Sequence, residues 1–192
     1  TGSTLNYTEN GAAAAINTSI TVSDVDNATL STATVSITAG FASGQDVLSF
    51  TNVPATMGNI TGSYNASTGV MSLSSAGNTA TLAQWQAALR AVQYSNSSDN
   101  PSTSSRTVSY VVNDSALNSN TVSSTINVTA VNDAPVLATG STLNYTENDA
   151  ATAINGVITV SDVDNTTLAT ATVAITTNFV SGQDVLSFTN VP

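Results

Sequence analysis

The chain repeats itself after 138 residues. The letters TGSTLNYTEN open the sequence and return at Thr139, and 44 of the 54 residues at 139–192 are identical to residues 1–54 without a gap. Self-similarity at a fixed period predicts serial copies of one folding unit, and it constrains the fold more than any local pattern. We therefore expect one complete repeat at 1–138 and the N-terminal part of a second, near-identical repeat at 139–192, within a longer array.

The composition excludes several classes of protein. Twelve carboxylates against two arginines give a net charge of −10, and neither Cys nor His is present. Without Cys there is no disulfide framework and no thiol chemistry. A chain this acidic cannot bind nucleic acid by neutralising phosphates, although it can attract cations. It also has no apolar run of about 18 residues, so we expect no insertion into a membrane.

Most of the chain alternates between apolar and polar residues. In Thr121–Val131, for example, Val122, Ile126 and Val128 share one face, which is the period-two pattern of a half-buried strand. Ile60–Tyr64 and Val70–Leu73, joined by NASTG, predict a hairpin. The same pattern predicts further strands at Leu5–Tyr7, Ile20–Val22, Ala33–Thr38, Val47–Phe50, Val92–Tyr94 and Thr107–Val112.

One stretch has a helical period instead. Within residues 81–90, Leu82, Trp85 and Leu89 recur at helical spacing, and Thr81 with Gln84 predicts a capping box. The chain is thus predicted to be all-β, an antiparallel two-sheet sandwich with one short helix per repeat. The predicted core positions of the first repeat are Ile20, Val22, Val35, Ile37, Leu48, Phe50, Val108, Tyr110, Val112, Ile126 and Val128.

The carboxylates of Asp24 and Asp26 follow Ile20 and Val22 with the same parity, and Asp162 and Asp164 occupy the same places in the second repeat. Burying them beside the aliphatic residues would be prohibitively costly, so the strand should end near Ser23 and the carboxylates should lie at one pole of the sandwich. Hard oxygen ligands gathered in this way suit Ca²⁺. The alternative is that these residues only form turns and caps. A pair of glycosidase acids is disfavoured, since no aromatic platform accompanies them.

Four motifs together carry a resemblance to a known family. YTEN, ITVSDVDN, SYVVNDS and INVTAVNDAP occur in this order along the first repeat. In this order they resemble the cadherin repeat, and most closely the bacterial cadherin-like tandem repeats of very large secreted surface proteins and adhesins. The resemblance covers the whole repeat, including residues 82–110. It implies an immunoglobulin- or cadherin-like sandwich, located outside the cell or on its surface.

The resemblance also implies a calcium site between consecutive repeats. Glu9, Asn132 and Asp133 would act with Asp162 and Asp164, whereas Asp24, Asp26 and Asp114 would serve a junction with a preceding repeat. Two departures reduce the number or the affinity of the ions expected. Ala130 stands where the usual linker has its first acidic residue, and the mid-repeat Leu-Asp-x-Glu motif has no counterpart.

We therefore expect a non-enzymatic module whose partners are neighbouring repeats of the same chain. Three hypotheses remain open: a spacer in an adhesin, a subunit of an extracellular filament or sheath with other copies as partners, and a carbohydrate-binding accessory of a secreted enzyme. Alone, residues 139–192 would leave half a sandwich exposed. We expect the chain to continue past Pro192 and complete it; strands from another molecule are the alternative.

Three further residue assignments follow from the pattern. Trp85 is predicted to be a core residue and not a sugar-stacking residue. GQDVLSF at 44–50 is predicted to form a turn and a strand, since a glycine-rich calcium nonapeptide needs several tandem copies. Arg106 is predicted to pair with a nearby carboxylate such as Asp99, in a structural role.

Overall fold

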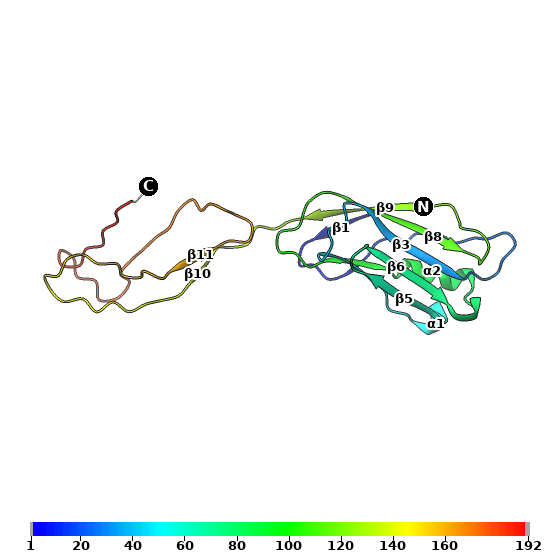
Figure 1. Ribbon diagram of the computed structural model, residues 1–192, viewed down its shortest axis with the longest axis horizontal. Helices are drawn as coiled ribbons and strands as arrows, with labels where there is room; N and C mark the ends of the chain where they lie inside the picture. The colour runs from blue at the N-terminus through cyan, green and yellow to red at the C-terminus, as the bar shows by residue number, and fades with distance from the viewer. Residues whose placement is uncertain (1, 191–192) are drawn as a thin grey trace. The chain divides into compact units, whose positions relative to one another are not determined.

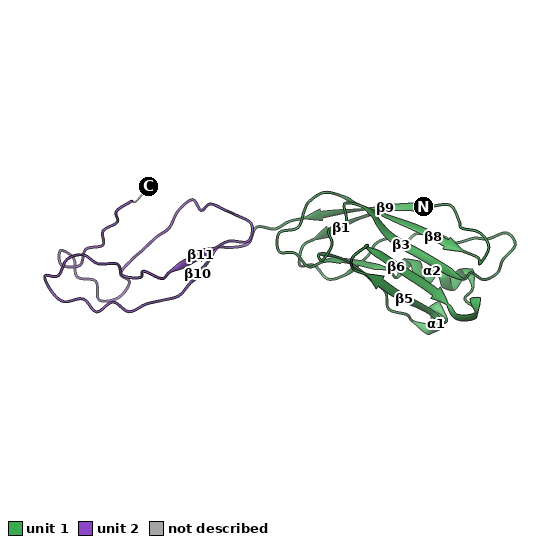
Figure 2. Ribbon diagram, in the orientation of Figure 1, with its two compact units in different colours: residues 1–132 green, residues 133–192 purple. Residues whose placement is uncertain are grey.

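The computed structural model describes residues 2–190 and divides the chain into two compact units, residues 1–132 (unit 1) and 133–192 (unit 2) (Figures 1 and 2). Most of unit 1 is regular structure. Its elements, in chain order, are β1 (Thr4–Thr8), β2 (Ala14–Ala15), β3 (Thr32–Ala39), β4 (Asp46–Ser49), α1 (Pro54–Met57), β5 (Ile60–Asn65), β6 (Val70–Ser75), the 3₁₀ turn η1 (Ala76–Asn78), α2 (Leu82–Arg90), β7 (Gln93–Asn96), β8 (Arg106–Asn113) and β9 (Val122–Thr129).

The strands of unit 1 form two sheets. One has six strands in the order β1-β9-β8-β3-β6-β5, and the other has three in the order β2-β7-β4. All pairs are antiparallel except β1 with β9, in which Thr4 lies opposite Thr125 and Thr8 opposite Thr129. The prediction of a wholly antiparallel arrangement is wrong for this pair. The two strands come from opposite ends of the unit, so no tight turn dictates their relative direction.

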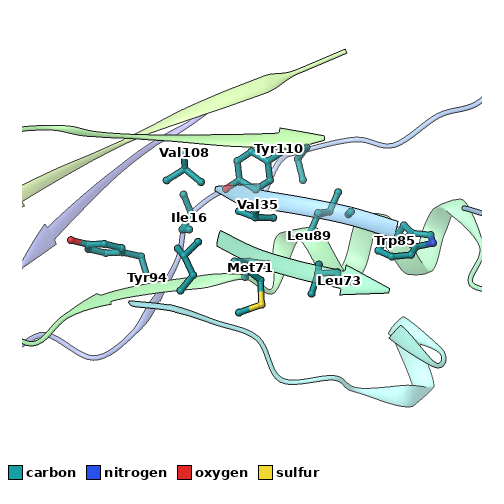
Figure 3. Close-up of a cluster of buried hydrophobic side chains, with 14 of the residues drawn as sticks. Ile16, Val35, Met71, Leu73, Trp85, Leu89, Tyr94, Val108 and Tyr110 are labelled. Atoms are coloured by element: carbon teal, nitrogen blue, oxygen red, sulfur yellow. The ribbon is translucent and has the colours of Figure 1, made fainter. Parts of the chain in front are cut away.

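Side chains from both sheets and from α2 form one buried cluster (Figure 3). Trp85 of α2 is fully buried and donates its indole N–H to the carbonyl of Leu30 at 3.1 Å, which confirms its place in the core. The rings of Tyr7 and Tyr94 meet edge to face, with centroids 5.1 Å apart. Of the predicted core positions, only Val22, Phe50 and Val112 are partly buried, and all three pack against the same cluster.

Two local predictions are confirmed residue by residue. The α2 helix begins at a capping box in which Thr81 accepts from the Gln84 N–H and the Gln84 side chain accepts from the Thr81 N–H. The hairpin of β5 and β6 pairs Ile60 with Ser75 and Asn65 with Val70. The expectation of a single helix is wrong, because the short α1 also forms, with Pro54 in its first turn where no N–H is needed.

The strand predicted at Ile20–Val22 is also wrong, although Ile20 is buried. Side chains of α2 pair with its backbone instead of a neighbouring strand. The Arg90 Nε donates to the Ile20 carbonyl at 2.8 Å, and the Val22 N–H donates to Gln86 Oε1 at 3.3 Å. The segment is therefore held as an extended stretch against the helix, with no partner in either sheet.

Unit 2 has much less regular structure. Its strands are β10 (Val136–Ala138) and β11 (Thr159–Ser161), an antiparallel pair. The strands predicted at Leu5–Tyr7, Ala33–Thr38 and Val47–Phe50 have identical or nearly identical equivalents at 143–145, 171–176 and 185–188, and none of these three equivalents forms a strand. Residues 158–160, the equivalents of Ile20–Val22, overlap β11. In unit 1 the partners of the equivalent segments are β6, β7, β8 and β9, all from residues 55–129. Residues 133–190 contain no counterpart of that segment, so the apolar side chains stay exposed.

Candidate functional site

At one end of unit 1, the first acidic pair forms a tight turn. Asp24 Oδ1 accepts hydrogen bonds from the backbone N–H groups of Asp26, at 2.9 Å, and of Asn27, at 2.8 Å. This side-chain-to-backbone pattern is the reason that Asp is favoured where a chain leaves an extended segment. The Asp24 side chain is half-buried, whereas Asp26 is exposed.

The third residue predicted for this pole, Asp114, lies beside the same turn. Asn27 Nδ2 donates to Asp114 Oδ2 at 3.2 Å, which joins the two loops. The backbone N–H groups of Leu117 and Ala116 donate to the Asp114 carboxylate and hold its pKa below its ordinary value. The structure thus brings Asp24 and Asp114 to one pole of unit 1, linked through Asn27.

Glu9 lies just beyond the C-terminal end of β1 and is buried, with 5% of its surface exposed. Its backbone N–H donates to the Thr129 carbonyl at 3.0 Å, and its Oε1 accepts from the Val131 N–H at 2.8 Å. The other carboxylate oxygen, Oε2, is buried without a hydrogen-bond partner. A buried polar atom that has no partner carries a desolvation penalty of about 1–3 kcal/mol, and more if it is charged. The Glu9 carboxylate therefore has one buried oxygen that could accept from a hydrogen-bond donor or bind a cation, and its other oxygen already accepts from the Val131 N–H.

The three acidic residues predicted for unit 2 come together within that unit. The Asp133 N–H donates to Asp164 Oδ2, and Asp162 Oδ1 accepts from the N–H groups of Asp164, at 2.9 Å, and of Asn165, at 2.7 Å. The Asp162 turn repeats the Asp24 turn of unit 1 almost atom for atom. The linker residue Asp133 is joined to it through Asp164.

The acidic residues of each unit are thus brought together by hydrogen bonds, but their carboxylates do not point at a common centre. Within residues 2–190, no three of them approach closely enough to form a ready-made metal cluster. The turns use one oxygen each of Asp24, Asp114 and Asp162 for backbone hydrogen bonds. The chemistry of the donor set nevertheless fits Ca²⁺, which accepts carboxylate, amide and carbonyl oxygens in flexible geometry.

A buried polar cluster around Asp46 and Arg106 was not predicted from the sequence. Arg106 at the start of β8 pairs with Asp46 at the start of β4, with Nη2 3.3 Å from Oδ1, and both side chains are fully buried. Asp46 also accepts from the Tyr94 hydroxyl at 2.6 Å and from Asn96 at 2.7 Å. Burial above all, together with the hydrogen bond to Asp46 and its charge, raises the pKa of Tyr94.

The partner predicted for Arg106, Asp99, is therefore wrong, although the structural role holds. A signal for the true pair is present in the sequence. Arg106 shares its strand parity with the core residues Val108 and Tyr110, and Asp46 shares its parity with Leu48, so both charges had to lie on the core face. A buried charge needs a buried counter-charge, and Asp99 lies in a loop. Since the pair is sealed from solvent, it holds the sheets together and cannot reach a substrate.

Comparison with known proteins yields one relative. A 94-residue stretch, 48% of this chain, is 39% identical to part of Halomucin from Haloquadratum walsbyi (strain DSM 16790 / HBSQ001). That stretch is 1% of Halomucin, so the chain spans only a small fraction of its relative's length. No family model and no solved structure matches the chain. Within residues 2–190, no helix has the length and apolar character needed to cross a bilayer.

Proposed function

We propose that the chain is a non-enzymatic structural repeat of a very long extracellular protein, and that Ca²⁺ stiffens the junction between consecutive repeats. The near-identity of 139–192 with 1–54 supports a tandem array. The great length of the protein is supported by Halomucin, because the 94 residues that match this chain make up only 1% of it. The mostly β architecture with more than one sheet is compatible with a sandwich repeat. In such an array the repeats act as spacers, and an adhesin would use them to hold a distal binding domain away from the cell.

The observation that carries the calcium proposal is the carboxylate of Glu9. It is buried at the end of unit 1 that leads into the linker, and its Oε2 has no partner. A neutral hydrogen-bond donor would relieve one oxygen, but a divalent cation would also compensate the charge. When bound, Ca²⁺ would supply that charge and accept six to eight oxygen ligands.

The remaining ligands would come from Asn132, Asp133, Asp162 and Asp164. Within unit 2, Asp133 is already joined to Asp164, and the turn around Asp162 is already formed. Because these residues are ordered by hydrogen bonds before any ion arrives, little conformational entropy would be lost on binding. Asp24, Asp26 and Asp114 would serve the equivalent junction with a preceding repeat.

The test is the response of thermal unfolding to calcium and to a chelator. Ligands assembled only in the folded state couple binding to stability, by about 4 kcal/mol at most when Ca²⁺ is 1,000-fold above its dissociation constant. An Asp162→Asn, Asp164→Asn double variant should lose this response. The matched control is Asp149→Asn, Asp184→Asn, which makes the same change in charge in the same unit away from the proposed ligands.

Glu9 allows a second matched pair, because Glu147 stands in the identical context TLNYTEN. Glu9→Gln should weaken calcium binding about tenfold, which is about 1.4 kcal/mol, whereas Glu147→Gln should leave it unchanged. Isothermal titration calorimetry measures both. If chelator changes neither the wild type nor any variant, the acidic residues form only turns and the calcium proposal fails.

A second candidate function is a subunit of an extracellular filament or sheath. The exposed apolar side chains of unit 2, such as Val173 and Phe188, favour it, because unpaired strands recruit strands from other chains. Electron microscopy of the native protein separates the candidates: isolated threads support a spacer, and ordered fibres support a polymer.

A further inference from the structure

The triplet Asn-x-Ser/Thr, with any residue except proline in the middle, recurs throughout unit 1. It is the acceptor motif for N-linked glycosylation, in which a surface asparagine receives a sugar. Unit 1 contains eight such triplets, and Asn100 is excluded because Pro101 follows it. The asparagines of the eight are Asn6, Asn17, Asn27, Asn59, Asn65, Asn96, Asn113 and Asn127. Such triplets arise readily in a chain rich in Ser, Thr and Asn, so the structure has to separate an acceptor from a coincidence.

Burial removes five of the eight triplets. Asn17 and Asn96 are themselves buried, with exposed fractions of 0% and 4%. In three others the middle residue of the triplet lies in the core; these residues are Tyr7, Ile60 and Val128. A transferase has to bind the asparagine and the hydroxyl two residues later together. It would have to pull that middle side chain out of the core, at a cost in hydrophobic stabilisation.

The three remaining asparagines differ in what the side-chain nitrogen Nδ2 contacts. Asn27 Nδ2 donates to Asp114 Oδ2 at 3.2 Å, and Asn113 Nδ2 donates to Asn118 Oδ1 at 2.8 Å. Within residues 2–190, Asn65 Nδ2 has no hydrogen-bond partner, although Oδ1 of the same side chain has two. Nδ2 is the atom that forms the bond to the sugar. Of the three, only Asn65 can therefore present this atom without first breaking a hydrogen bond.

Asn65 is the last residue of β5, where the chain turns toward β6, and the side chains of Asn65, Ala66 and Ser67 are all exposed. Asn65 Oδ1 accepts hydrogen bonds from the Ser67 N–H at 3.0 Å and from the Ser67 hydroxyl at 2.7 Å. The hydroxyl that the motif requires thus already lies against the acceptor amide. Hydrogen bonds to Oδ1 polarise the amide, which makes an Nδ2 proton easier to remove.

We propose that Asn65 is an acceptor site for N-linked glycosylation, with a lipid-linked oligosaccharide as the donor and an oligosaccharyltransferase as the catalyst. Asn65 Nδ2 attacks the anomeric carbon of the first sugar and forms a bond to it. The bond from that carbon to the phosphate oxygen of the lipid carrier breaks, and the lipid phosphate leaves with the electron pair. One proton passes from Nδ2 to a base of the enzyme. The proposal rests on the extracellular location in the proposed function, because such transfer acts on exported chains.

A glycan on Asn65 would protect the edge of the six-stranded sheet. β5 is the strand at that edge, and its sequence ITGSYN contains neither a charged residue nor a proline. Charges and prolines are the usual means by which an edge strand avoids pairing with another chain. A bulky, hydrated glycan at the end of β5 would hinder the same pairing sterically.

The experiment offers the folded 192-residue chain, made in a host without N-glycosylation, to a purified oligosaccharyltransferase and a lipid-linked oligosaccharide. The enzyme is one that glycosylates the synthetic peptide GSYNASTGV, residues 62–70, so that a negative result with the folded chain refers to the fold. Mass spectrometry of proteolytic peptides locates the glycan. Transfer in vitro does not depend on where the chain resides or on calcium. Failure of the proposed function would instead appear as absence of the native protein from the cell surface and the medium.

Within unit 1, we expect Asn65 to be modified on the order of tenfold faster than Asn27 or Asn113, since each of these must first break its hydrogen bond. Asn65→Gln and Ser67→Ala should both abolish transfer to this turn, whereas Asn27→Gln should leave it unchanged. Trp85 fluorescence during urea denaturation shows whether each variant is folded. The proposal is overturned if Asn65 stays unmodified in the folded chain, or if Asn27 or Asn113 is modified at an equal or higher rate.

Discussion

Residues 1–54 and 139–192 have nearly the same sequence but not the same structure. Thr32–Ala39 form the central strand β3 between β8 and β6, whereas residues 170–177 form no strand. The local turns, in contrast, are alike: the Asp24 and Asp162 turns accept the same two backbone hydrogen bonds, and the Asp46 and Asp184 turns are matched in the same way. The segments differ in that only the first is covered by residues 55–129.

The comparison separates what is encoded locally from what is not. A turn closed by an Asp side chain needs groups two to four residues away, which every copy of the sequence carries with it. A strand needs a neighbour to pair its backbone and a second layer to bury its side chains. In this protein the sequence of a strand is therefore necessary but not sufficient for the strand to form. Residues 55–129 must supply the neighbouring strands and the second layer.

The largest effect is expected at Arg106, which lies within residues 55–129. Arg106→Met would leave Asp46 buried without its counter-charge and should cost about 3–5 kcal/mol in the free energy of unfolding. The control is Arg90→Met, which removes a hydrogen bond from a partly buried arginine to the Ile20 carbonyl and should cost about 1 kcal/mol. Urea denaturation followed by Trp85 fluorescence measures both, and equal costs would contradict the structural role of the pair.

An intermediate effect is expected when a residue of 1–54 is replaced by its non-identical equivalent from 139–192. Gly40→Asn would bring a Cβ against the Ser105 carbonyl and should destabilise the sandwich by about 1–3 kcal/mol. The reverse change, Asn178→Gly, lies in solvent and should leave the unfolding midpoint unchanged. If both variants unfold at the wild-type midpoint, the close approach of Gly40 to the Ser105 carbonyl does not restrict the residue at position 40.

The smallest effect concerns acid and Asp114. Its folded-state pKa is lowered by the backbone N–H groups of Leu117 and Ala116, so its contribution is present above the unfolded pKa of about 3.9 and is lost as the pH falls through the folded value. Asp114→Asn should therefore reduce the fall in melting temperature between pH 6 and pH 3. Differential scanning calorimetry at the two pH values measures it, with Asp99→Asn as the charge-matched control. An unchanged fall in Asp114→Asn would show that the carboxylate contributes nothing to acid stability.

The sequence predicted those parts of the fold that depend on nearby residues or on parity. The Thr81–Gln84 capping box, the β5–β6 hairpin and the burial of Val35 and Ile126 all follow from spacing alone. The parallel pairing of β1 with β9 and the docking of Ile20–Val22 on α2 depend on residues far away in the chain. Periodicity carries no information about such partners.

The candidate site also has parts that could be predicted from nearby residues and parts that could not. The Asp24 and Asp162 turns were predictable as places where an extended segment ends in carboxylates. The buried environment of Glu9 was not, since it arises only when β1 pairs with β9 and the Val131 N–H, just after β9, donates to the Glu9 carboxylate. The Asp46–Arg106 pair was predictable in principle, from the parity of both residues on their strands.

The most direct test of the dependence of strand formation on residues 55–129 is hydrogen exchange of the wild-type chain. Peptides covering 33–37 and 171–175 contain the equivalent residues ATVSI and ATVAI, so their intrinsic exchange rates are closely matched. We expect the amides of 33–37 to be protected by orders of magnitude and those of 171–175 to exchange almost as fast as in an unfolded chain. Equal protection of the two segments in a monomer would contradict the claim that a strand forms at 33–37 only because residues 55–129 pair with it.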